Sequence, residues 1–204
     1  MNSTISTGRL LRANTRGCVV GCRVGETPPA FGALVYIPAE NGRIYGLVSD
    51  VHIDDDGLVR QLAAVGTLPE TVIEDNRINR NIPLELSVIF IGSEAQGKIS
   101  HLLPPRPPLS LDEMIVCDDA MVHAFTSAGR FGYMRHILAD ENAPTSDLLT
   151  AFLQTADKAN RAHGSTGWIK AAVQEIIILL RGDHERLTVV LSAISDVFPN
   201  SFED

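Results

Sequence analysis

The chain has 204 residues, of which 45% are hydrophobic and 21% are charged, and its formal net charge is -8. These fractions are typical of globular domains and exclude an intrinsically disordered chain. The longest apolar run, residues 176–180, is far shorter than the roughly 18 residues that span a bilayer. The N-terminus also lacks the basic start and apolar core of a signal peptide. We therefore expect a cytoplasmic protein without membrane contact, in which three cysteines are thiols rather than a disulfide framework.

The first half of the chain predicts short β-strands separated by glycine and turn residues. Apolar residues alternate, or gather between glycines, in six segments: 8–13, 17–24, 32–37, 43–51, 84–92 and 97–103. Between the fourth and fifth segments, leucine and valine recur at near-helical spacing, which predicts a short helical insertion near 54–82. Six strands in about 100 residues favour a β-barrel, because closure removes exposed edges.

A proline segment divides this half from the next. Four prolines among residues 104–108 continue neither a strand nor a helix, because proline lacks the backbone donor and fixes its φ angle. Directly after it, Ser110 and Glu113 have the spacing of a capping box, and apolar stripes of helical period follow. We predict an α+β protein with a six-stranded barrel at 1–108 and an all-helical bundle at 109–204.

Four arginines gather near the N-terminus without any acidic neighbour. Arg9, Arg12, Arg16 and Arg23 lie within the first 25 residues, where no aspartate or glutamate occurs. Such a group suits an acidic protein partner or phosphates, although four arginines on a net-acidic chain give only a weak nucleic-acid signal. A solvated barrel surface is the alternative. These are the candidate partner-binding residues.

Catalytic and cofactor patterns are sparse. Gly97-Lys98-Ile99-Ser100 lacks the preceding glycine and the spacing of a phosphate-binding loop, so we expect no nucleotide cofactor. Asp54 and Asp56, with His52 nearby, suggest a metal-dependent phosphodiesterase or nuclease as the alternative function. A solvated turn is favoured for these aspartates, because adjacent residues point in different directions. We therefore expect no catalytic site, no metal site and no enzymatic activity.

Three segments of the first half resemble a known family. They are Gly8-Arg9-Leu10, the glycine-containing run at residues 44–51, and the proline-rich exit at residues 102–108. On these residues the chain resembles the HAS barrel, the N-terminal β-barrel shared by HerA-type DNA-translocating ATPases and ATP synthase subunits. The whole chain is similar to stand-alone bacterial HAS-barrel proteins, in which a helical tail follows the proline exit.

The resemblance implies a scaffold rather than a motor, because the ATPase core that follows the barrel in the translocases is absent. In those ATPases the barrel packs the ring and offers a docking face to partner proteins. The expected function is a non-catalytic protein-interaction or scaffold module, a partner or adaptor of a HerA-type ATPase ring. Direct DNA contact and self-association into a homo-oligomer stay open at this point.

Overall fold

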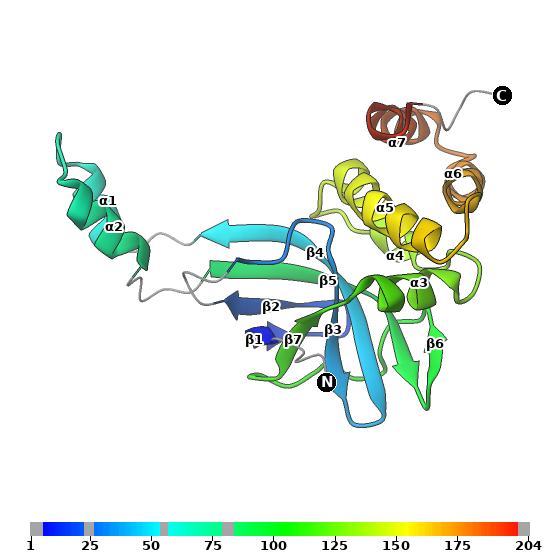
Figure 1. The fold of residues 1–204 in the computed structure, drawn as a ribbon, viewed down its shortest axis with the longest axis horizontal. Helices are drawn as coiled ribbons and strands as arrows, with labels where there is room; N and C mark the ends of the chain where they lie inside the picture. Colours follow the sequence, from blue (N-terminus) through cyan, green and yellow to red (C-terminus); the bar gives the residue numbers. More distant parts are fainter. Residues whose placement is uncertain (1–5, 23–26, 54–56, 79–83, 200–204) are drawn as a thin grey trace.

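Six antiparallel strands close into a barrel in a computed structural model, which describes residues 6–22, 27–53, 57–78 and 84–199. Around the ring, β1 pairs with β2, β2 with β5, β5 with β4, β4 with β3, β3 with β7, and β7 with β1. The six strands are β1 Ser6–Ala13, β2 Gly17–Cys22, β3 Leu34–Ala39, β4 Gly42–Ile53, β5 Leu84–Ala95 and β7 Glu113–Val116. The predicted mixed α+β class and the six-stranded barrel are confirmed (Figure 1).

The closing strand differs from the predicted one. The segment predicted at 97–103 forms only the short strand β6 (Lys98–Ser100), which pairs with β5 outside the ring. Closure instead comes from β7, which lies after the proline segment and pairs with both β1 and β3. The barrel therefore extends beyond residue 108, where the sequence predicted its end.

The predicted helix start at Ser110 is wrong. Leu111 has a φ of 71°, a left-handed conformation that cannot continue an α-helix. Asp112 caps a turn instead, because its Oδ2 accepts a hydrogen bond of 2.7 Å from the backbone N–H of Leu109. The backbone of this turn is tied to β1, with the N–H of Leu10 donating to the carbonyl of Asp112. The capping-box spacing thus marks a turn that leads into a strand.

Helices fill the rest of the second half, as the apolar stripes predicted. Asp118 and Asp183 are the N-caps of α3 and α7, with side chains that accept from the N–H groups of Met121 and Arg186. The other four helices of this half pack against the long helix α5. The helices are α3 Asp119–Ser127, α4 Met134–Leu138, α5 Thr145–Ala162, α6 Trp168–Leu179 and α7 His184–Val197.

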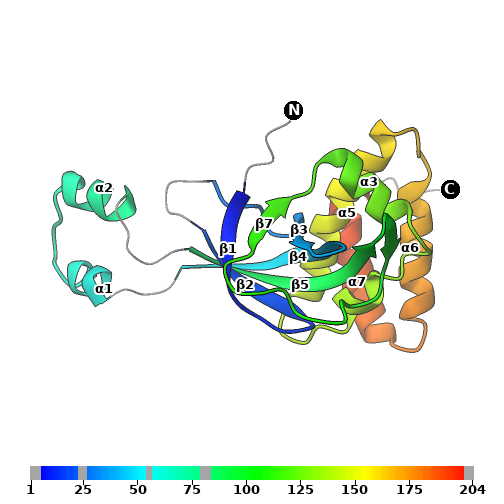
Figure 2. The same cartoon turned by 90° about the horizontal axis from the view of Figure 1, so that it is seen from below.

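Two apolar cores lie on opposite sides of the barrel wall. The inner core fills the barrel with side chains such as Leu10, Val35, Phe90 and Met114. The outer core joins the barrel to the helices, and its barrel members are Leu34, Tyr36, Tyr45, Leu47, Ile91 and Ile115. In β3, residues 34–37 are all buried, because this strand has the barrel interior on one face and helices on the other. Figure 2 shows the C-terminal helices gathered at one end of the barrel.

The predicted insertion forms two helices that project from the barrel. They are α1 (Gly57–Ala63) and α2 (Glu70–Ile78), which follow β4 and precede β5 in the chain. We call residues 57–78 the arm. Figures 1 and 2 both place the arm well away from the barrel and from the C-terminal helices.

Within the described residues, no helix has the length and apolarity that a bilayer span requires.

Candidate binding groove

The structure separates the predicted arginines. Arg9 and Arg12 lie on β1, Arg16 lies in the turn between β1 and β2, and Arg23 lies outside the described residues. The Arg9 side chain donates to Glu113 Oε1 at 2.7 Å and to the carbonyl of Leu111 at 3.0 Å. Arg12 forms an ion pair with Glu85 at 3.6 Å. The two carboxylates that pair with these arginines come from distant strands, so the first 25 residues alone could not indicate them.

Two of the arginines line a groove where the barrel meets the helical half. Its volume is about 800 Å³, and its walls come from the β1–β2 turn, from β4 and β5, and from the segment between α4 and α5. Both polar and apolar residues line it. Its polar lining includes Arg12, Asn14, Arg16, Cys18, Asp50 and Asp140.

A tight turn holds the arginine wall in place. Asn14 Oδ1 accepts hydrogen bonds from the backbone N–H groups of Arg16 (2.7 Å) and Gly17 (3.1 Å). The carbonyl of Arg16 accepts from the N–H of Phe90 at 2.8 Å, which ties the turn to β5. A Cβ at Gly17 would lie 2.4 Å from the carbonyl oxygen of Val88, so only glycine allows this close approach. Arg16 is thus an exposed side chain on a fixed backbone.

The opposite wall comes from the helical half and is fixed by a second polar turn. Asp140 Oδ1 accepts from the N–H groups of Asn142 (2.8 Å) and Ala143 (3.1 Å). Thr145 Oγ1 donates to the carbonyl of Asp140 at 3.2 Å, just where α5 begins. Each wall therefore presents charged side chains from a backbone that hydrogen bonds hold in one conformation.

The groove carries charges of both signs. Arg12 and Arg16 contribute positive charge, and Asp50 and Asp140 contribute negative charge. A polypeptide segment with acidic and basic residues can match such a surface, because opposite charges across an interface fix its register. Cys18 also lines the groove, but burial raises its pKa to about 12, so it is a neutral thiol at physiological pH and a poor nucleophile.

The alternative metal site receives no structural support from the described residues. Asp54 and Asp56 lie outside them, and His52 is an exposed residue near the end of β4. Among the residues that are described, no three histidine, cysteine, aspartate or glutamate side chains gather as a metal site would require.

A second polar cluster joins α3 to α5, and sequence reasoning missed it. His123 Nδ1 lies 2.9 Å from Oδ1 of Asn160 and 3.3 Å from Oγ of Ser127. The Asn160 amide is fully buried and donates to Thr126 Oγ1 and the carbonyl of Ala156, so its oxygen faces His123 and the Nδ1–H donates. Ser127 and Asn160 thus contact the same ring nitrogen of His123. In a catalytic triad, the nucleophile and the third residue contact the two different ring nitrogens of the histidine. The cluster fixes α3 on α5.

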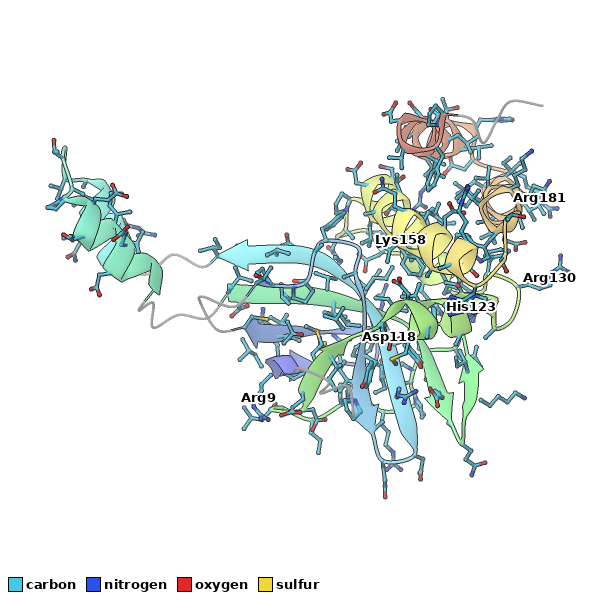
Figure 3. The ribbon with its side chains drawn as sticks, viewed as in Figure 1. Arg9, Asp118, His123, Arg130, Lys158 and Arg181 are labelled. Carbon is cyan, nitrogen blue, oxygen red and sulfur yellow. The ribbon has the colours of Figure 1, made fainter. Side chains whose placement is uncertain are left out.

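This cluster lies far from the N-terminal strands, as the positions of His123 on α3 and Arg9 on β1 show (Figure 3). The His123 ring stacks on that of His163, with 4.5 Å between ring centroids and 5° between planes. A metal ion lies in the plane of each imidazole that binds it, so two parallel stacked rings do not share one. Their 40-residue separation matches no metal-ligand spacing, which explains why no sequence motif indicated the pair.

His101 and Trp168 have structural roles. His101 is buried, its Nε2 lies 3.1 Å from the carbonyl of Phe125, and burial lowers its pKa. Trp168 is buried in the outer core, as its place in an apolar stripe predicted. The groove is therefore the feature that brings predicted binding residues together.

No family model matches the chain, and no curated protein matches it.

Proposed function

We propose that this protein is a non-catalytic interaction module that binds a segment of a partner protein in the groove between its barrel and its helical half. The observation that carries the proposal is that Arg12, Arg16 and the Asp140 turn, from the two halves of the chain, line one groove of about 800 Å³. Both walls are rigid, which reduces the conformational entropy lost on binding. The preferred segment is extended and carries both acidic and basic side chains.

The resemblance to HAS barrels supplies the class of partner. In HerA-type ATPases, the HAS barrel offers a docking face beside the motor ring. We therefore propose a HerA-type ATPase, or a protein that works with one, as the first partner to test. The second wall of the groove is the segment between α4 and α5, and in this proposal the C-terminal helices pack as a bundle that holds this segment in place, since α5 begins immediately after the Asp140 turn.

The test compares groove variants with a matched surface variant. The full chain, the double variant Arg12→Glu/Arg16→Glu and the control Arg106→Glu are immobilised, and binding of the purified ATPase is measured by interferometry. Arg106 is exposed and lies in the proline segment outside the groove. We expect the double variant to bind about tenfold more weakly or worse, because attractive contacts become repulsive, while the control binds as the wild type does.

The outcomes separate the parts of the proposal. Equal binding by all three chains contradicts the groove as the binding surface. If the ATPase does not bind the wild type, the ATPase assignment fails, and cross-linking in native cells with a photoreactive residue at Asn142 then identifies or excludes another protein in the groove. Direct DNA contact through Arg9, Arg12, Arg16 and Arg23 predicts an affinity that falls steeply with salt.

A further inference from the structure

Hydrogen bonds connect the end of β6 to the helical wall of the groove. The backbone carbonyl of His101 accepts from two consecutive side chains of α4, the guanidinium of Arg135 and, at 2.9 Å, Nε2 of His136. α4 leads directly into the Asp140 turn, and the N–H of Asp140 donates to the carbonyl of Ile137 at 3.3 Å. The position of α4 on the barrel therefore sets the position of this wall.

The side chain of the same histidine is enclosed. The His101 ring lies 4.9 Å from the Phe125 ring and 5.0 Å from the Tyr133 ring, measured between centroids. Its Nε2 lies 3.1 Å from the carbonyl of Phe125, so Nε2 carries the hydrogen in the neutral ring and a second proton must bind at Nδ1. That nitrogen lies beside Gly129 and Gly132, where an added Cβ would be 3.3 Å and 3.4 Å from it. These close contacts fix the ring in one place.

The charges that act on this ring are positive and come from α4. Burial lowers the pKa of His101, the hydrogen bond to the Phe125 carbonyl opposes this effect, and the charges of Arg135 and His136 lower the pKa further. From the loop before α4, Tyr133 contributes only a neutral phenol, because burial raises its pKa. A protonated His101 therefore places its charge beside the two side chains that hold α4 on the barrel.

We propose that protonation of the His101 ring regulates the groove: the new charge repels Arg135 and His136, loosens α4 on the barrel and displaces the Asp140 wall. This inference rests on the proposed function, because it assigns a regulation to the same groove. A histidine that binds a proton more readily in a locally opened state favours that state as the pH falls. The opened population should rise by up to about tenfold per pH unit below the unfolded-state pKa of 6.5. Partner binding weakens over the same range.

Hydrogen exchange of the full chain, measured by mass spectrometry without a partner at pH 7.5, 6.5 and 5.5, tests the inference. After correction for the intrinsic exchange rate, protection of residues 134–142 should fall up to about tenfold per pH unit below 6.5, whereas protection of β5 should not. His101→Phe should remove this fall. Arg135→Gln should reduce it, because its amide can still donate to the carbonyl of His101 without the charge. His184→Gln, at an exposed position on α7, is the matched control and should respond as the wild type does.

The two variants keep the inference testable if one of them does not fold. Protection of residues 134–142 that stays constant with pH in the wild type overturns the inference. The same is true of a pH response that persists unchanged in the folded variants.

Binding of the purified ATPase is then measured at the same three pH values. Weaker binding in acid by the wild type, but not by His101→Phe, supports the regulation, and pH-independent binding overturns it. If the ATPase does not bind even at pH 7.5, the proposed partner is contradicted. The exchange result still decides the effect of His101 on α4, because it is obtained without a partner.

Discussion

A fragment of residues 1–103 should fail to fold as a barrel, because it lacks the strand that closes the ring. It loses Met114 and Ile115, which are 0% and 8% exposed in the full chain. It also uncovers Leu34, Tyr36, Tyr45, Leu47 and Ile91, whose outer faces the helices cover. Burying a large apolar side chain contributes roughly 1.5–3 kcal/mol, so the total loss is on the order of 10 kcal/mol. That is comparable to the whole stability of a domain, about 5–15 kcal/mol.

Circular dichroism and urea unfolding of the fragment and the full chain measure this effect. We expect the full chain to unfold in one cooperative transition and the fragment to show none. A second fragment, residues 1–117, keeps β7 and should contain more β-structure, while its uncovered outer wall binds a hydrophobic dye. A cooperative transition in the fragment of residues 1–103 would refute the reasoning and show that the halves separate at the proline segment, as the prolines alone suggested.

Three substitutions should change stability in defined ways, each measured by urea unfolding. Gly46→Val should cost about 1–3 kcal/mol, because its Cβ would lie 2.8 Å from the carbonyl oxygen of Ile89, whereas Gly66→Val, in open space, should not. Asn160→Ala should cost about 1–3 kcal/mol by leaving buried partners without hydrogen bonds. The pKa of His101 is lowered chiefly by burial. Its contribution to the free energy of unfolding is therefore complete above the unfolded-state pKa of 6.5 and decreases as the pH falls below that value. His101→Phe should make the free energy of unfolding fall less between about pH 7 and pH 5. The same pH dependence in the variant and the wild type would contradict this role of His101.

The barrel strands were predictable where apolar residues alternate along the chain or form a continuous apolar run. Strand β7 was not, because its four residues follow a turn whose Ser110 and Glu113 have the spacing of a helix cap. Only the long-range pairing of β7 with β1 and β3 distinguishes a strand from a helix at this position. Local pattern therefore predicted the number of barrel strands correctly and the identity of the closing strand incorrectly.

Of the candidate groove, only the wall that carries Arg12 and Arg16 was predictable from the sequence. Arg12 and Arg16 were selected because no acidic residue lies near them in the chain. The carboxylate of Glu85 beside Arg12 and the wall built on Asp140 come from segments far along the sequence. Their proximity depends on strand register and on how α5 begins, and neither is encoded in local composition.

The pairing of the first barrel strand with the last sets an order of events during synthesis. Arg9 and its partner Glu113 are 104 residues apart, so one edge of β1 has no native neighbour until β7 has been made. At about 5–20 residues per second, that interval lasts roughly 5–20 s. Throughout it, a nascent chain presents an open strand edge, which is a template for association with other chains. We therefore expect newly made protein to depend on chaperones more than its modest length would suggest.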